Sequence, residues 1–409
     1  LVIKRLKKDF YNYFIALKDY KRNLDKYRGL PKLPSPKKLS KMNQYSIPLD
    51  SYTSISLRKL EKQHLIGINL SSKMRYFYIG KDTEVFKNVK LANVKYQNNE
   101  IYLQFSYELN NTLKDDLKPQ KYAGLDIGLK NLVSLFIDDR ETSSLLIDGA
   151  NYKYFNYRYN KLISKLDEAI AKEAIEFKTT KTGTRYAVKW NGLGMYLKKF
   201  KTYLTQKRNE YFKSNFHKLS RKIVEYLQLH GVTDLVISSK LAELKNNGKC
   251  NLSKQVKQSF IQIPFIKLLQ YIEEKCCEVG IKVIKVDESY TSEVSCISSD
   301  VLKMQAYSNG VIERSREEST YNGKRIKRGL FKDTLLNKVF NADLNGAVNH
   351  IKLATDKSFT WLKDNLWKLN NPIKLKSAGE LHNLLCNIRS NKSLKERTTA
   401  CACRYSISY

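Results

Sequence analysis

The sequence predicts an α/β protein, because stretches with strand periodicity and stretches with helix periodicity follow each other in one long segment. Three consecutive strands come first, and then strand, helix, strand and helix in that order. The strands are expected at residues 122–128, 131–137, 143–148, 234–237 and 281–286, and the helices at 265–279 and 341–352. This is the order of elements in a ribonuclease-H-type core.

A basic helix and a small β domain are expected before this core. Residues 1–30 carry aromatic and apolar side chains at helical spacing among lysines, and an extended, proline-rich basic linker follows at 29–36. The chain starts within this basic stretch, so we expect an N-terminal truncation. From about 40 to 110, short alternating runs separated by turn residues indicate a small β-barrel or sandwich, and 110–120 is a polar linker.

Two other segments differ from the α/β pattern. A long and strongly basic helical region is expected at 156–230, with an interruption near 179–194, and it would be an insertion into the core. Residues 353–409 show one short helix and no other pattern, and part of this segment is expected to be disordered. No internal repeat is found.

The composition points to a polyanionic partner. The 409 residues include 74 Lys and Arg against 40 Asp and Glu, a formal net charge of +34. A compact fold with this charge repels itself, and binding to nucleic acid explains it most simply. No long uncharged apolar run and no signal-peptide pattern is present, so neither a spanning helix nor a membrane partner is expected. The seven cysteines lack a framework spacing, which fits free thiols in a reducing compartment.

Asp126 is an unusual residue for an apolar strand. Period-2 alternation puts Ala123, Leu125 and Ile127 on the core face, and Gly124, Asp126 and Gly128 on the other face. A buried carboxylate needs a cation, a set of hydrogen-bond donors or water, and glycines on both sides allow another backbone or a metal-bound phosphate to come close. The alternative is an aspartate at a strand end that caps a turn.

Asp343 is the second candidate for chemistry. It lies at the start of the last predicted helix, where the backbone N–H groups and the helix dipole favour a negative group. The alternative is an ordinary helix N-cap. A basic cluster precedes it, and with Lys130 this cluster is expected to contact nucleic acid. Its members are Lys324, Arg325, Lys327, Arg328 and Lys332.

Several motifs follow the order found in one family. Residues 124–131 (GLDIGLKN) resemble the first RuvC-type motif of TnpB, the RNA-guided nuclease of insertion-sequence transposons and a relative of type V CRISPR effectors and Fanzor proteins. Residues 341–347 (NADLNGA) resemble the third motif. Segments between the second and third motifs are similar to 287–292 (DESYTS) and 323–330 (GKRIKRGL), and the end of the recognition region to 17–21 and 28–34. The similarity spans about residues 10–352.

The resemblance implies a domain organisation. Its nuclease part would be a RuvC-like ribonuclease-H-type core at 119–288, with the helical insertion at 156–230 and the final helix at 341–352. The remaining parts would be a partial recognition helix with its linker at 1–39, a wedge-like β-barrel at 40–118, a degenerate target-nucleic-acid-binding insert at 289–340 and a tail at 353–409.

The chain departs from the family at the second motif. The family has a glutamate after an apolar strand, whereas here Ser238 and Ser239 follow the strand 234–237. Glu243 lies further on, beyond the end of the strand. Glu288 is the better replacement, because Ile284, Val286 and Glu288 share one face by alternation, as in family branches with a displaced glutamate. We therefore expect a site of Asp126, Glu288 and Asp343; the alternative for Glu288 is a solvated turn residue.

The zinc ribbon of the family is also degenerate in this sequence. Only Cys296 remains between residues 289 and 340, and one thiolate without neighbouring Cys or His cannot complete a tetrahedral zinc site. No zinc is expected.

The resemblance implies an RNA-guided DNA endonuclease of a transposon, with guide RNA and target double-stranded DNA as partners. Mg²⁺ or Mn²⁺ would be held by Asp126, Glu288 and Asp343. The basic helices at 181–189, 198–207 and 221–222, with their tyrosines, suit a groove for an RNA–DNA duplex, although many of these lysines are expected only to face solvent. Such a protein would work in the cytoplasm at the nucleoid of a bacterium or archaeon, or in the nucleus of a eukaryotic or viral host.

Two alternative functions stay open. A nuclease-inactive, repressor-like RNA-guided DNA-binding protein would explain the missing glutamate after strand 234–237. An unguided RNA-binding protein would explain the charge, but not the pairing of the segments around Asp126 and Asp343.

Overall fold

The computed structural model describes residues 2–390 apart from several gaps, and the chain divides into two compact units, Leu1–Asn110 and Asn111–Tyr409. The finer domain boundaries remain predictions. The residues that it leaves undescribed are 1, 28, 36–43, 50–54, 71–72, 81–82, 84–85, 87–88, 98–99, 108–119, 181–182, 240–261, 287–292, 299–303, 309–310, 315–320, 328, 356 and 391–409.

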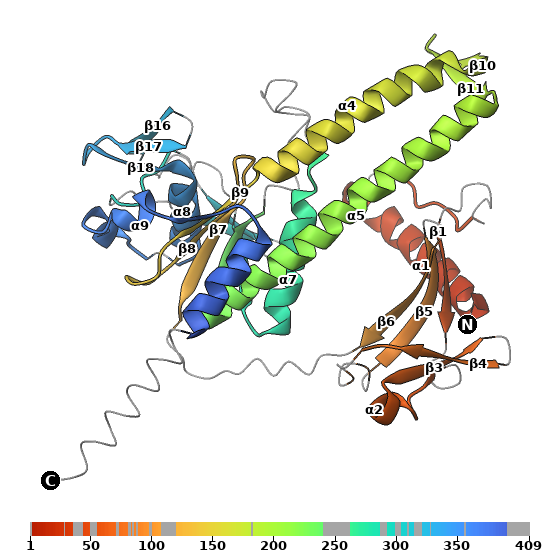
Figure 1. The fold of residues 1–409 in the computed structure, drawn as a ribbon, viewed down its shortest axis with the longest axis horizontal. Coiled ribbons are helices and arrows are strands. Elements are labelled where there is room, and N and C mark those ends of the chain that lie inside the picture. The colour runs from red at the N-terminus through yellow and green to blue at the C-terminus, as the bar shows by residue number, and fades with distance from the viewer. Residues whose placement is uncertain are drawn as a thin grey trace. The chain divides into compact units, whose positions relative to one another are not determined.

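The first unit contains the predicted basic helix and short antiparallel strands (Figure 1). Helix α1 (Val2–Arg22) is followed by a turn of 3₁₀ helix, η1 (Leu24–Lys26), and the carboxylate of Asp19 accepts hydrogen bonds from Asn23, Lys26 and Tyr27 across this end. The strands form two three-stranded sheets around a small core with Ile68 and Ala92. One is β1 (Gln44–Leu49), β5 (Val89–Gln97) and β6 (Glu100–Tyr107); the other is β2 (Ile55–Ser56), β3 (Leu65–Leu70) and β4 (Lys73–Tyr78), with the short helix α2 (Leu60–Gln63) before β3. The pairs between described strands do not establish a closed barrel.

An eight-stranded sheet organises the second unit, and the mixed α/β class is confirmed. Its order is β14-β15-β13-β12-β7-β8-β9-β19. The centre is an antiparallel meander of β7 (Tyr122–Asp126), β8 (Asn131–Ile137) and β9 (Leu145–Asp148), and β12 (Asp234–Ser238) and β13 (Lys282–Val286) lie parallel to β7. At the edges are β14 (Met304–Ser308), β15 (Val311–Arg314) and β19 (Ile373–Leu375). The five central strands follow the element order predicted from the sequence.

Apolar side chains cover both faces of this sheet, as alternation along buried strands requires. The first core contains Leu125, Leu135 and Leu235 of the sheet together with side chains of α5 (Gly192–Leu229) and α7 (Phe265–Glu278). The second core contains Phe136, Val236 and Val286, and it is covered by α8 (Ala342–Thr355), η4 (Thr360–Lys363) and α9 (Trp367–Asn370). Helix α8 therefore lies on the face of β7 that carries Gly124 and Asp126.

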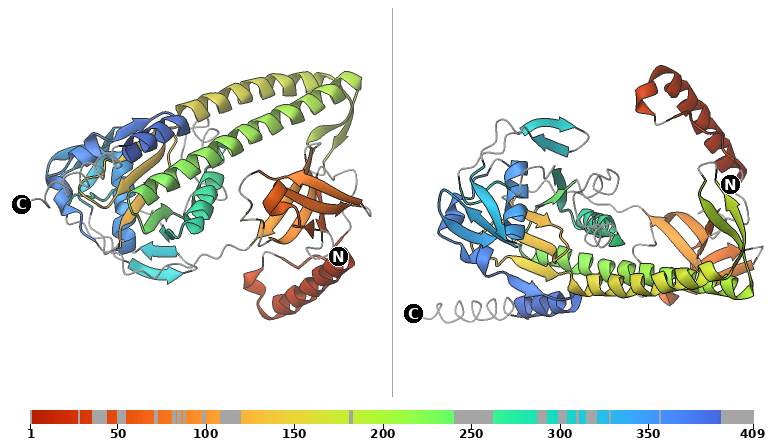
Figure 2. Two further views of the ribbon diagram at one scale, coloured as in Figure 1. Left: turned by 60° about the horizontal axis from the view of Figure 1, so that its bottom comes forward. Right: turned by 90° about the horizontal axis from the view of Figure 1, so that it is seen from above.

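The predicted basic helical insertion is a pair of long helices with a β-hairpin at their far end (Figure 2). Helices α4 (Ala150–Lys172) and α5 (Gly192–Leu229) are joined by β10 (Ala174–Thr179) and β11 (Arg185–Trp190). The interruption predicted near 179–194 is thus a β-hairpin, which begins at Ala174, earlier in the chain than expected. Asn191 closes it, because its side chain accepts from the Gly194 N–H at 2.8 Å and donates to Glu173. Among the described helices, none combines the length and the apolar character that a bilayer crossing needs.

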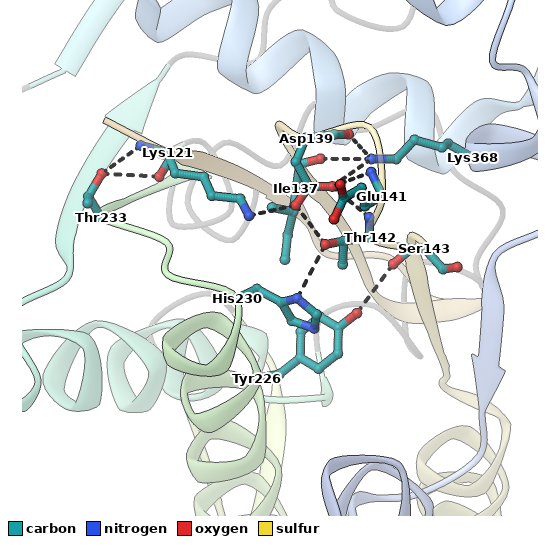
Figure 3. A network of polar contacts seen from close by, with 10 residues as sticks. All are labelled: Lys121, Ile137, Asp139, Glu141, Thr142, Ser143, Tyr226, His230, Thr233 and Lys368. Atoms are coloured by element: carbon teal, nitrogen blue, oxygen red, sulfur yellow. Dashed lines mark hydrogen bonds and ion pairs between the residues drawn. The ribbon is translucent and has the colours of Figure 1, made fainter. Parts of the chain in front are cut away.

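The C-terminal segment is more ordered than the sequence suggested. After α8 it forms η4, α9, the edge strand β19 and a helix at residues 378–390. Lys368 on α9 is completely buried and donates to the carbonyl oxygens of Ile137, at 3.2 Å, and of Asp139 (Figure 3). Its Nζ also lies 3.4 Å from a carboxylate oxygen of Asp139 and 4.8 Å from the centre of the Phe136 ring. Lys368 therefore joins the C-terminal segment to the turn between β8 and β9.

The charges in this network compensate each other. Burial raises the pKa of the Asp139 carboxyl, but the hydrogen bonds from Lys121 and Thr142 outweigh it, so the pKa lies well below its ordinary value. Burial lowers the pKa of Lys368, and the nearby Asp139 opposes this shift. His230 of the turn after α5 contacts Thr142 at 3.2 Å, which ties that turn to the same network (Figure 3).

We predict that Lys368→Met destabilises the second unit by about 3 kcal/mol, because buried carbonyl acceptors lose their donor. Lys363→Met, an exposed change in the same segment, should alter stability by less than about 0.5 kcal/mol. The measurement is equilibrium urea denaturation followed by circular dichroism. Equal midpoints for the two variants would show that the buried ammonium does not hold this segment.

Candidate active site

Asp126 ends strand β7 at the point where α8 crosses it. A Cβ built on Gly124 would lie 1.8 Å from the carbonyl oxygen of Ala347, so the helix backbone rests directly on the strand. Only glycine allows this approach. The expectation that the glycines beside Asp126 admit another backbone is thus confirmed at Gly124. On the next residue, the carbonyl oxygen of Leu125 lies 3.0 Å from Nδ1 of the buried His350, which must carry the proton because a carbonyl only accepts.

The carboxylate of Asp126 lies against the first part of α8. A Cβ on Gly346 would be 3.1 Å from Oδ2 of Asp126, so the absence of a side chain at Gly346 makes room for the carboxylate. Asp343 comes three residues before Gly346, and residues at this spacing share one side of a helix. The structure therefore brings Asp126 and Asp343 to the same side of the N-terminal turns of α8.

Asp343 is not the N-cap of α8. The side chain of Asn341 accepts the N–H groups of Asp343, at 2.9 Å, and of Leu344, at 3.0 Å, and it takes the capping role. The carboxylate of Asp343 is instead held by Asn131, whose Nδ2 donates to Oδ2 at 2.7 Å. Arg325 lies 3.8 Å from Oδ1, and 23% of the Asp343 side chain is exposed. Asn131, which the sequence did not single out, is therefore part of this site.

Strand β12, which lies parallel beside β7, has no acidic residue next to Asp126. Val236 pairs with Gly124, so Ser238 lies on the same face as Asp126 in the adjacent strand, and it is buried. Strand β13 continues this surface: Ile284 and Val286 contribute to the second core, as alternation predicted. Glu288 follows two residues later, and it lies outside the described residues, as does Glu243.

Within the described part of the chain, no group of three or more His, Cys, Asp or Glu side chains could hold a metal ion. The described residues thus contribute two carboxylates, those of Asp126 and Asp343. Two carboxylates together with phosphate oxygens are a donor set that suits Mg²⁺, which keeps several water ligands. The residues present fit this cation, although a third protein ligand would have to come from outside the described ranges.

A basic hairpin precedes Asp343 in the chain, and one of its side chains contacts it. Strand β18 (Lys338–Asn341) runs directly into α8 and pairs with β17 (Leu330–Asp333), which pairs with β16 (Gly323–Lys327). Besides the Arg325 contact, Lys130 approaches the turn of this hairpin, since a Cβ on Gly329 would be 3.9 Å from its Nζ. Lys324 and Lys327 are exposed on β16, Lys332 is half-buried on β17, and Arg328 lies outside the described residues.

The short described segment at residues 293–298 is attached to α8 by hydrogen bonds. The backbone N–H of Cys296 donates to the Asn345 side chain at 2.9 Å, and the carbonyl oxygen of Val294 accepts from Asn345 and Asn349 at 2.9 and 2.8 Å. Cys296 is buried in the second core. It is one of four described cysteines, all of them free thiols, as expected.

Two segments of the chain match models of known families. Residues 104–242 match OrfB_IS605, described as a probable transposase, and residues 265–350 match the Cas12f1-like TNB domain. The first match contains Asp126 and Ser238, and the second contains Asp343. The chain is therefore a relative of the TnpB-type and type V effector proteins, which confirms the resemblance stated from its motifs.

Two solved structures match the chain at low sequence identity. "Cryo-EM structure of the Cas12f1-sgRNA-target DNA complex" is 16% identical, with 81% of this chain and 74% of that chain covered and a TM-score of 0.36. "Cryo-EM structure of CRISPR-Cas12f Ternary Complex" is also 16% identical, with 80% and 66% covered and a TM-score of 0.39. No curated protein matches the chain.

We predict that Gly124→Ala destabilises the second unit by about 3 kcal/mol, the upper range for overpacking, because a backbone oxygen occupies the space of the new methyl group. Gly192→Ala is the matched control, since nothing lies within 4 Å of an added Cβ there. That change in the first turn of α5 should be neutral or slightly stabilising. Urea denaturation of both variants measures the difference, and similar stabilities would show that α8 does not press on β7.

Proposed function

We propose that this protein is an RNA-guided DNA endonuclease of the TnpB type, and that its second unit cuts DNA with Mg²⁺ or Mn²⁺. The observation that carries the proposal is the placement of Asp126 and Asp343 on one side of the first turns of α8, within the two segments that match the family models. A structural role alone does not explain why two acidic side chains lie on the same side of one helix end in a strongly basic protein.

The strand order supports a RuvC-like, ribonuclease-H-type core. An antiparallel meander β7-β8-β9, extended by parallel strands β12 and β13 and covered by α8, corresponds to the element order expected for that core. In such a sheet, acidic residues at the carboxyl ends of parallel strands lie at one edge. Asp126 ends β7 at this edge.

We propose that Asp126, Glu288 and Asp343 hold the metal. When bound, Mg²⁺ would stabilise the charge on the attacking and leaving oxygens of the phosphodiester. Asn131 fixes the orientation of the Asp343 carboxylate, and the N–H groups of the first turn of α8 are taken by Asn341, so they do not compete for it. Arg325 and Lys130 would bind the DNA backbone beside the carboxylates.

The case for Glu288 comes from the face of β13. Ile284 and Val286 lie in the core beneath α8, on the side of the sheet that carries Asp126. The position beside Asp126 in β12 is a serine, and a hydroxyl cannot replace a metal-binding carboxylate. If the alternation of β13 continues past its end, Glu288 is the acidic residue that falls on the same face as Val286.

The proposed partners are a guide RNA and target double-stranded DNA. The net charge of +34, the basic hairpin β16–β17 and the family matches support them. We further propose that the segment at residues 293–298 needs no zinc, because the amides of Asn345 and Asn349 hold it on α8 by hydrogen bonds.

A second candidate function is RNA-guided DNA binding without cleavage, and Ser238 is the observation that favours it. The test begins with sequencing the RNA that copurifies with the full chain. A single discrete species supports guidance, and a broad mixture contradicts it. Plasmid DNA matching that RNA is then incubated with the complex and Mg²⁺; tight binding without cutting would support the second candidate.

We predict that Asp126→Asn and Asp343→Asn each lower the cleavage rate by about a hundredfold or more, the size typical for loss of one group that stabilises developing charge. Binding of the target should remain within about threefold of the wild type. Asp364→Asn, an exposed change on the same unit, is the control and should cut normally. Normal cutting by either site variant would remove the proposed metal site.

A separate prediction concerns the third ligand. Glu288→Gln should abolish Mg²⁺-dependent cleavage, because an amide oxygen carries no charge for the metal, and it should leave nucleic-acid binding intact. Glu293→Gln, five residues further on and exposed, removes the same charge and should leave the rate unchanged. If both variants cut like the wild type, the site lacks Glu288.

A further inference from the structure

A cavity of about 500 Å³ opens between helices α4 and α5 of the insertion. None of its lining residues belongs to the candidate active site. Its apolar surface comes from two aromatic and two leucine side chains, Phe155, Tyr159, Leu162 and Leu204. Leu162 is 43% exposed, so the cavity is open to solvent, and its volume is within the range of small-ligand sites.

The aromatic walls of this cavity are held in place by their neighbours. The Phe155 ring stacks on Tyr211 with centroids 3.8 Å apart and planes at 18°. The Tyr159 hydroxyl is hydrogen-bonded to Thr205 at 2.9 Å, and the Arg208 guanidinium lies 5.0 Å from the centre of the Tyr159 ring. Rigid aromatic walls reduce the entropy lost when a ligand binds.

Arg208 is a structural part of the cavity wall. It donates to the Asn156 side chain at 3.0 and 2.8 Å and to the carbonyl oxygen of Gln262 at 2.5 Å. Burial lowers the pKa of its guanidinium from the ordinary value. Arg208 therefore fixes the two helices against residue 262, and it is not available as a mobile contact.

The rim of the cavity is cationic and contains no acidic residue. Besides Arg208, four exposed basic side chains line it, Arg158, Lys161, Lys165 and Lys207. Lys207 has an acidic neighbour, Glu210, at 3.6 Å, an exposed pair that solvent weakens. An apolar, aromatic floor inside a cationic rim selects a ligand with a flat apolar face and negative charge.

We propose that this cavity binds one unpaired nucleotide of a nucleic-acid strand, with its base against Tyr159 and Leu162 and its phosphates against the cationic rim. This deepens the proposed function and rests on its nucleic-acid partner. A paired base hides its faces in the stack, whereas an unpaired base presents one to an aromatic side chain. An apolar peptide or a lipid chain would not need the rim.

The experiment compares 20-base-pair RNA–DNA hybrids that carry a fluorescein at one end. One hybrid is perfectly paired, one has a single unpaired adenosine in the RNA strand, and one has it in the DNA strand. Fluorescence anisotropy gives the Kd of the full chain for each at a fixed salt concentration. We expect about tenfold tighter binding of a hybrid with an unpaired nucleotide, the effect of one additional stacked base. The preferred strand identifies the source of the nucleotide.

Two glutamate variants test whether this cavity is the site. Leu162→Glu should remove the preference, because it puts a carboxylate into the cavity. Leu193→Glu adds the same charge at a leucine of α5 that is 54% exposed and does not line the cavity, so it should weaken all three hybrids equally and keep the preference.

The other possible results would contradict the cavity proposal, or both this proposal and the proposed function. Equal binding of all hybrids by the wild type would remove the cavity proposal and leave the proposed function standing. A preference that persists in Leu162→Glu would place the recognition elsewhere and also remove it. Failure to bind any hybrid would contradict the nucleic-acid partner itself, and with it both proposals.

Discussion

The close contact between α8 and β7 is the constraint on which the candidate site depends. The carbonyl oxygen of Ala347 occupies the space of a side chain at Gly124, so the helix can cross the strand only at this point. Two residues further along β7, Asp126 then meets Gly346, and Asp343 lies one helical turn before it. The hydrogen bond between His350 and the Leu125 carbonyl is a second contact at the same crossing. Three small residues and one buried histidine thus determine where two carboxylates lie.

The two carboxylates have an apolar core on one side and basic residues on the other. Beneath them, α8 closes an apolar core with Val236, Val286 and Phe340, which excludes water from the strand ends. Arg325 of the basic hairpin lies beside Asp343, and Lys130 approaches the turn of the same hairpin at Gly329. Charge interactions at a half-buried position are screened less than at a free surface. In the proposed function, these basic side chains would attract an anionic backbone to this edge, and a cation would lie between the carboxylates and the phosphate.

Much of this arrangement follows from the sequence, because alternation assigns a strand residue to a face without knowledge of its partners. Asp126 and the two glycines beside it, and the parity of Ile284 and Val286, are of this kind. What the sequence could not give depends on contacts across long separations. Lys368 looks like any helical lysine until its carbonyl partners at Ile137 and Asp139 are known, and β19 is too short to show a period. Asn131 and Asn341 are not distinguished in the sequence either, because Asn131 acts through the distant Asp343 carboxylate and Asn341 through the start of α8.

The register of the parallel strands bears on our proposal that Glu288, after β13, replaces the glutamate that the family has after the strand corresponding to β12. Ser238 pairs with Val286, and Ile237 pairs with Leu125, so β7, β12 and β13 end at nearly the same level of the sheet. Neighbouring strands are about 4.8 Å apart, which puts β13 about 10 Å from β7. If Glu288 supplies the third carboxylate, as we propose, its side chain has to span this separation of two strands. A glutamate side chain is one methylene longer than that of an aspartate, so it would reach further across this separation. The proposed exchange of a glutamate after β12 for one after β13 is therefore favoured by the longer side chain of glutamate and by the parity that residue 288 shares with Val286 along the chain.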